Sequence, residues 1–359
     1  MKLKNRNISI DIIRISAIIL VIVLHTIILA TNKSNLFVLR LDYFLEPFKA
    51  FSRVSVPIFF MISGFLLLGK KQSTKLNFKR IYKRLLIPFV FFTLLNSVYS
   101  LIFIHNMDYY KSILNQFVKI SEYLGSHLWF LLVLSFLYLF NPFLQQIFSN
   151  YDKNRSYKKI KWITAIAFLY TLLTGVIIYP LNQKFGLSFN NFTIWPSYLF
   201  FYLYGGLLRK EVLVIKNLKV SALIIIIGLL SIISFDYISI SFKLRGIDFL
   251  FSDYSVNYLS IPVILTSIGF INFILSYQFN FNKSKKEIIK IISNYTFGVY
   301  LVHIYLLEII NIVFIKQGIA HSINIYFKTI IYLILTIFLS YLLVYIIKRN
   351  KLTRLIIGG

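Results

Sequence analysis

Residues 10–26 read IDIIRISAIILVIVLHT, an apolar run that nevertheless contains Asp11, Arg14 and His25. A charged side chain at the centre of a bilayer costs roughly 2.5–3.5 kcal/mol on insertion scales, so such residues usually face a bundle interior and serve a function. Asp11 and Arg14 are three positions apart and share a helix face. Arg14 and His25 are about 20° out of line on a helix and roughly 16 Å apart along its axis. The stretch predicts a polar stripe along a membrane helix. An interfacial Asp11–Arg14 pair, with a His25 that hydrogen-bonds to a neighbouring helix, is the alternative.

Similar apolar runs recur along the whole chain. Its 359 residues are 58% hydrophobic and 14% charged, whereas a soluble globular chain is about a quarter charged. Apolar runs of about 20 residues are typical of membrane-spanning helices. We therefore predict an all-α polytopic membrane protein, a single domain over residues 1–359 with about ten transmembrane helices. The predicted spans are residues 8–30, 54–69, 81–104, 126–149, 160–179, 194–209, 218–235, 254–277, 291–315 and 325–347.

The basic residues gather on one predicted side of the membrane. Of the 39 Lys and Arg residues, 27 fall in the amino-terminal segment, in the tail, or after every second span. The positive-inside rule then places both termini in the cytoplasm. The formal charge of +27 is explained by topology and by attraction to anionic lipid, and no nucleic-acid-binding module is visible. The first apolar run is too long for a signal peptide and lacks a small-residue cleavage site, so we expect a retained helix.

Metal and disulfide chemistry are not indicated. The chain contains no Cys, which excludes disulfides and thiolate metal sites, and we predict no metal. The sequence also shows neither an inverted repeat nor a pair of broken helices, features that are common in secondary transporters.

Further polar residues interrupt the later spans. His127 and Trp129, in SHLWFLLV, are expected near the outer face, as is His25, and Tyr300 and His303 share a helix face three positions apart. Each has a simpler interpretation: Trp129 as an interfacial anchor, His127 as a helix cap, and His303 as a satisfied polar contact.

Two more segments could bind a ligand. In FKRIYKRLLIP, Arg80 pairs with Arg84 and Lys79 with Lys83 at a spacing of four. The pairs indicate either a cytoplasmic clamp for phosphate, which guanidinium groups bind bidentately, or a positive flank that only sets topology. In VPIFFMISGFLLL, Ser63–Gly64 forms a notch of small residues. Such a notch lets helices approach closely or leaves room for a thin ligand chain.

Six segments together resemble the acyltransferase-3 family of bacterial membrane O-acyltransferases. They follow one another in the family's order and cover nearly the whole chain. The resemblance is to the short branch without an extra extracytoplasmic domain, which includes the O-acetyltransferase of enterobacterial common antigen. The segments are DIIRISAIILVIVLH (residues 11–25), SVPIFFMISGFLLLGK (55–70), FKRIYKRLLIP (78–88), HLWFLLVLSFLYLFNPFLQ (127–145), FFYLYGGLLRK (200–210) and SNYTFGVYLVH (293–303).

The resemblance implies a membrane enzyme that moves an acyl group, most often acetyl, from cytosolic acetyl-CoA to a hydroxyl of an extracytoplasmic or lipid-linked glycan. It implies a multi-pass protein of the bacterial cytoplasmic membrane. The CoA phosphates would bind Arg80, Arg84 and their neighbouring lysines, and the pantetheine arm would pass Arg14 and Ser63–Gly64. The oligomeric state is left open.

His25 is the expected reactive group, either as general base on the acceptor hydroxyl or as a transient acyl-His nucleophile. Arg14 would orient the donor or stabilise an oxyanion, and Asp11 would hold Arg14. The rival classes are a polysaccharide exporter or polymerase without acyl transfer, and a sensor that keeps only the fold. The candidates for acceptor contacts are His127, Trp129, Tyr300 and His303.

Overall fold

The computed structural model describes residues 7–31, 36–68, 73–103, 127–149, 155–181, 194–247, 251, 254, 257–318 and 323–358. Every regular element among these residues is a helix, as the sequence predicted. The elements η1 and η2 are π-helical and η3 is a 3₁₀ helix. The bounds are α1 (Ile8–Thr31), α2 (Leu36–Ser52), α3 (Ser55–Leu67), α4 (Thr74–Ile81), η1 (Tyr82–Leu86), α5 (Ile87–Phe103), α8 (Trp129–Leu139), α9 (Asn141–Ser149), α10 (Arg155–Leu173), η2 (Thr174–Ile178), η3 (Trp195–Tyr198), α12 (Leu199–Arg209), α13 (Leu218–Leu244), α14 (Ile261–Ser276), α15 (Lys283–Lys316), α17 (Ile325–Arg349) and α18 (Lys351–Ile356).

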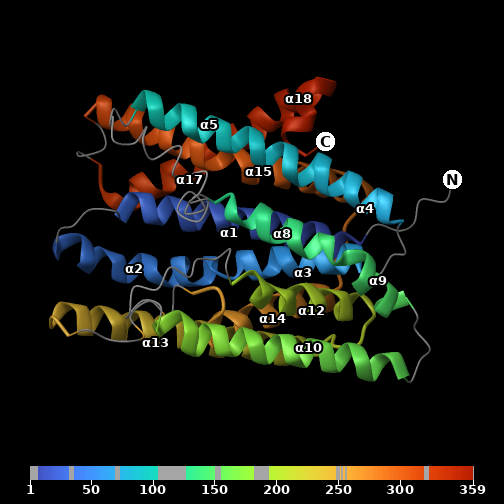
Figure 1. The fold of residues 1–359 in the computed structure, drawn as a ribbon. Helices are drawn as coiled ribbons and strands as arrows, with labels where there is room; N and C mark the ends of the chain where they lie inside the picture. Colours follow the sequence, from blue (N-terminus) through green and yellow to red (C-terminus); the bar gives the residue numbers. More distant parts are fainter. Residues whose placement is uncertain are drawn as a thin grey trace.

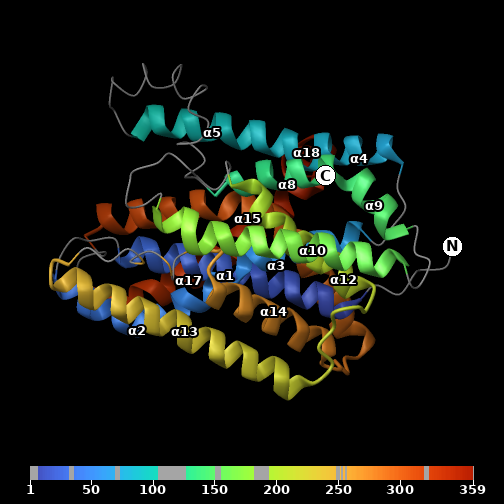
Figure 2. The ribbon, with the colours of Figure 1, turned by 60° about the horizontal axis from the view of Figure 1, so that its bottom comes forward.

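The helices form an elongated bundle in which most of them run along a common direction (Figure 1). Helix α1, the one with the polar stripe, contacts α2, α3, α14, α15 and α17. It is therefore enclosed by partners from both halves of the chain. In both ribbon views α4, α9 and α18 lie toward the same end of the bundle (Figures 1 and 2).

Six helical stretches are long and apolar enough to cross a membrane, and a bent pair makes a possible seventh. The predicted span at 54–69 lengthens, because α2 and α3 together give an apolar stretch of 24 residues. Residues 69, 104, 126, 255 and 256, at the edges of predicted spans, lie outside the described part of the chain. The six stretches are Ile8–Ala30, Phe44–Leu67, Lys158–Leu181, Leu218–Phe242, Lys283–Lys316 and Ile325–Arg349.

The other predicted spans are short or interrupted. Helix α5 has 17 residues, α14 has 16 and α12 has 11, which corresponds to about 26, 24 and 17 Å against a hydrocarbon core of about 30 Å. The predicted span at 126–149 is divided into α8 and α9, which meet at 54°. Pro142 lies in the first turn of α9, where its missing N–H is tolerated, and it prevents a continuous helix. Within the described part of the chain this is the one bent helix pair, so a second broken helix that would match it is not seen there.

A chain of buried hydrogen bonds holds the bend and the start of α4 together. The side-chain amide of Asn77 donates to the carbonyl of Tyr138 (2.6 Å), and that of Asn141 donates to Asn77 Oδ1 (3.1 Å). The hydroxyl of Tyr202 donates to Asn141 Oδ1 (2.9 Å). Helices α4, α8, α9 and α12 are thus tied at one point, which fixes α4 against the bundle.

The predicted notch on α3 is a site of direct backbone contact with α12. A Cβ atom on Gly64 would lie 1.8 Å from the carbonyl oxygen of Tyr202, and one on Gly205 would lie 1.8 Å from that of Met61. Only glycine fits at either position. Of the two interpretations of Ser63–Gly64, close helix approach therefore holds for Gly64, whereas Ser63 faces a cavity.

Candidate active site

A cavity of about 730 Å³ lies between α1, α3, the α4–η1 region, α8, α15, the end of α17 and the segment that follows it. This volume is within the usual range of about 300–1,000 Å³ for small-molecule sites. Five of the side chains that line it are cationic, and none of its described lining residues is acidic. The five cations are Arg14, Arg80, Arg84, Lys348 and Arg354.

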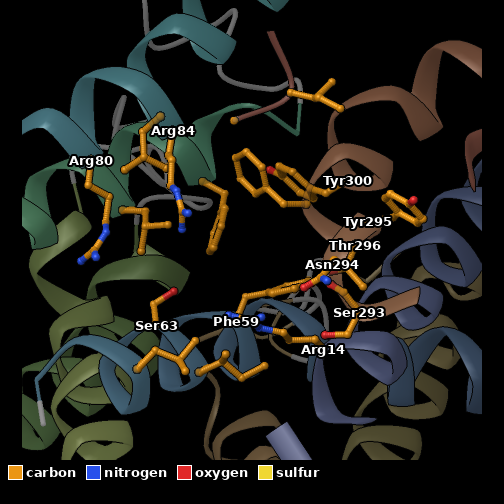
Figure 3. Close-up of a pocket in the computed structure, with 18 of the residues that line it drawn as sticks. Arg14, Phe59, Ser63, Arg80, Arg84, Ser293, Asn294, Tyr295, Thr296 and Tyr300 are labelled. Carbon is orange, nitrogen blue, oxygen red and sulfur yellow. The ribbon is translucent and has the colours of Figure 1, made fainter. Parts of the chain in front are cut away.

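Figure 3 shows the cations on separate walls of this cavity. Arg80 and Arg84 project from one side, Arg14 lies on another, and the stretch from Ser293 to Thr296 of α15 forms a polar wall near Arg14. Ser63 lies on the α3 side. A lining with five cations and no acid among its described residues suits a ligand with several negative charges, because guanidinium groups bind phosphate through paired hydrogen bonds.

The two pairs of basic residues on α4 and η1 are separated by the structure. Arg80 and Arg84 line the cavity, whereas Lys79 and Lys83 are exposed and are not among its lining residues. Each of these lysines directly precedes one of the arginines, and one position turns a helix by about 100°. The lysines and the arginines therefore point in different directions. Partial removal from water lowers the pKa of the Arg80 guanidinium from its ordinary value, and the nearby charge of Arg84 lowers it further.

Asp11 is buried next to the cavity. The hydroxyl of Ser293 donates to Asp11 Oδ1 at 2.7 Å, which links α1 to α15. Asp11 is not among the cavity's lining residues, whereas Arg14 is. The acid therefore positions the two helices that carry the cavity wall.

Three histidines from three parts of the chain meet farther along α1. The ring centroids of His25 and His303 are 5.3 Å apart, and those of His127 and His303 are also 5.3 Å apart. His127 and His303 are buried and His25 is half-buried. The sequence predicted that His25 and His127 lie at the same level, and the structure brings both to His303.

Hydrogen bonds to main-chain carbonyls fix two of these imidazoles. His303 Nδ1 lies 2.7 Å from the carbonyl oxygen of Tyr300, and His127 Nε2 lies 3.3 Å from that of Leu301. A carbonyl can only accept, so each of these nitrogens carries hydrogen. The other nitrogens, His303 Nε2 and His127 Nδ1, are buried without a protein partner. In the neutral imidazoles both are acceptors, and a buried acceptor without a partner is costly.

An aromatic wall separates the cavity from the histidines. Phe59, Phe130 and Tyr300 line the cavity, and their ring centroids are 5.6 to 6.3 Å apart. The hydroxyl of Tyr300 donates to the carbonyl of His127, and its ring centroid is 5.5 Å from the His127 ring. His25 lies beyond this wall and is not among the cavity's lining residues.

Trp129 packs inside the bundle. It is buried, and its ring lies 5.3 Å from Tyr198 and 6.0 Å from Tyr258 between centroids. It does not reach the cavity. Within the described part of the chain, no group of three or more His, Cys, Asp and Glu side chains is arranged to hold a metal ion.

Sequence reasoning missed several lining residues. Phe59 and Phe130 look like ordinary members of apolar runs, and their role depends on how helices cross. Lys348 and Arg354 stand out in the sequence as basic residues of the tail, but there they indicate only the positive flank that sets topology.

Comparison with known families identifies the class. The model of the acyltransferase-3 family, described as an acyltransferase domain, matches residues 7–349. Together with the apolar helices, this match defines a membrane acyltransferase. The chain belongs to the acyltransferase-3 family. Neither a curated protein nor a solved structure matches it in the corresponding comparisons.

Proposed function

We propose that this protein transfers an acetyl group from cytosolic acetyl-CoA to a hydroxyl of an extracytoplasmic or lipid-linked glycan. The observation that carries the proposal is the cation-lined cavity that ends at an aromatic wall, with three histidines directly behind it. The family membership supports acyl transfer. The end of the bundle with α4 and α18 would face the cytosol, in a multi-pass protein of the bacterial cytoplasmic membrane.

The donor would bind with its phosphates on Arg80 and Arg84. Both guanidinium groups line the cavity without an acidic neighbour in its described lining. Arg14 lies about 16 Å from His25 along α1, which is too far for a direct role at the reacting carbonyl. We therefore assign Arg14 to donor binding and set aside the oxyanion role.

The pantetheine arm would extend past Ser63 toward the aromatic wall. The rings of Phe59, Phe130 and Tyr300 would move apart to let the thioester reach the histidines. This movement would also keep water from the thioester until the donor is fully bound, which limits wasteful hydrolysis.

His25 would take the proton from the acceptor hydroxyl as its oxygen attacks the thioester carbonyl. The C–S bond then breaks, the acetyl group stays on oxygen, and the proton ends on the CoA sulfur. His303 Nε2 is a buried acceptor next to this ring, so it can accept hydrogen from one nitrogen of His25 and leave the other as base. An acyl-His25 intermediate uses the same geometry and ends with the same products.

The test is acetyl transfer in vesicles that contain the purified protein and membrane glycan, with labelled acetyl-CoA outside. His25→Ala should lower transfer by on the order of 10²- to 10⁴-fold, the usual contribution of a general base. Ile28→Ala changes an exposed residue of the same helix and should leave transfer unchanged. Full transfer by His25→Ala would remove the proposed mechanism, and glycan movement without label would indicate an exporter.

A further inference from the structure

The segment after α17 folds back onto the cavity. Lys348 at the end of α17, Arg354 on α18, and the following Ile357 and Gly358 all line it. Helix α18 packs against α5 and α17, and Figure 1 shows it beside α4 and α5. The family match ends at residue 349, so α18 lies beyond the matched region.

Burial and close contacts fix the position of this segment against the bundle. Ile357 and Gly358 are buried. Gly358 has a φ of +83°, and a Cβ atom there would lie 2.5 Å from the Phe297 ring and 3.4 Å from the carbonyl oxygen of Arg84. The hydroxyl of Thr353 donates to the carbonyl of Ile347 at 2.6 Å. The backbone is thus held between α15 and η1, next to Arg84, a residue predicted to bind phosphate.

The segment brings positive charge to a place that is already positive. Lys348 Nζ donates to the carbonyl of Asn294 at 2.5 Å and lies 4.6 Å from the centre of the Tyr295 ring. The charges of Arg354 and Arg84 both act on Lys348. Like charges at close range repel each other, and no acid lines this cavity among the described residues. An anion between them would relieve the repulsion.

We propose that Lys348 and Arg354 form a second phosphate-binding part of the donor site, in addition to Arg80 and Arg84. This inference rests on the proposed function. Coenzyme A carries phosphate at two separate places, the ribose 3′-phosphate and the pyrophosphate. The cavity offers cations from two separate parts of the chain, Arg80 and Arg84 on α4 and η1, and Lys348 and Arg354 on α17 and α18. The α18 segment is then part of the donor site, in addition to carrying positive charge on the predicted cytoplasmic side of the membrane.

The experiment measures acetyl-CoA binding to the purified full-length protein in detergent by titration calorimetry. Arg354→Gln removes an exposed cation with little structural role and should weaken binding about tenfold or more, as for the loss of a charge-assisted hydrogen bond. Lys351→Gln, an exposed residue on the same helix that does not line the cavity, is the matched control and should change binding less than twofold. Thermal unfolding of both variants should match the wild type.

The outcomes separate this inference from the function itself. If the wild type binds acetyl-CoA and Arg354→Gln binds it equally well, the inference is overturned and the proposed function stands. If the wild type binds neither acetyl-CoA nor free CoA, the proposed function fails. A second titration with dephospho-CoA assigns the contact. A loss of the Arg354→Gln effect places this residue on the 3′-phosphate, a persistent effect places it on the pyrophosphate, and both support the proposal.

Discussion

Gly64→Ala tests the contact on which the α3 wall of the cavity depends. The new Cβ would lie 1.8 Å from the carbonyl oxygen of Tyr202, whereas ordinary contact begins near 3.4 Å. The obstacle is backbone inside a helix and cannot rotate away, so α3 and α12 must separate by about 1.6 Å. Overpacking of this kind typically costs about 1–3 kcal/mol, and occasionally more.

The sign of the effect makes this variant informative. In an unobstructed helix, Gly→Ala stabilises by about 1 kcal/mol through helix propensity. We expect the clash to exceed this gain, with a net loss of about 2 kcal/mol and a fall of about 3 °C in Tm. Thermal unfolding in detergent micelles measures it. Ser63→Ala, the neighbouring change on the cavity side, should cost about 1 kcal/mol or less.

Gly205→Ala gives an independent check, because its Cβ would meet the carbonyl of Met61 at the same 1.8 Å. Once one variant has pushed the helices apart, the second costs less, so the double variant should lose less than the sum of the two. A Gly64→Ala protein as stable as the wild type, or more stable, would refute the assigned helix contact.

Two further results are expected. Arg80→Gln combined with Arg84→Gln should weaken acetyl-CoA binding by at least tenfold, because two cavity cations are lost. Lys79→Gln combined with Lys83→Gln should leave binding nearly unchanged in the same titration, and equal losses for both pairs would mean that the charges act only at long range. Tyr300→Phe removes a donor to the main-chain carbonyl of His127, just before α8, and should lower the free energy of unfolding by about 1 kcal/mol. Denaturant titration measures it, and a variant of unchanged stability would contradict this hydrogen bond.

Much of this architecture can be predicted from the apolar runs, because each must form a helix to satisfy its backbone in lipid. Polar residues inside or next to those runs also indicate the candidate site, since Arg14, Arg80 and Arg84 line one cavity, whereas Lys79 and Lys83 of the predicted phosphate clamp do not. Membrane helix counts are less predictable, since a bend such as the one at Pro142 divides a run without changing its hydropathy.

Contacts between helices could not be predicted in the same way. That His303 meets His25 depends on how α15 crosses α1, and nothing local in either segment encodes that crossing. The same holds for the aromatic wall. For Arg354, the positive-inside rule already explains the charge, so nothing in the sequence indicated the proposed role in donor binding.

The hydrogen bond between Ser293 and Asp11 joins residues 282 positions apart. During biosynthesis α1 leaves the ribosome well before its partners α15 and α17. The carboxylate of Asp11 therefore lacks this hydrogen bond until α15 has been synthesised. The cavity between α1 and α15 can therefore form only after the intervening part of the chain has been synthesised.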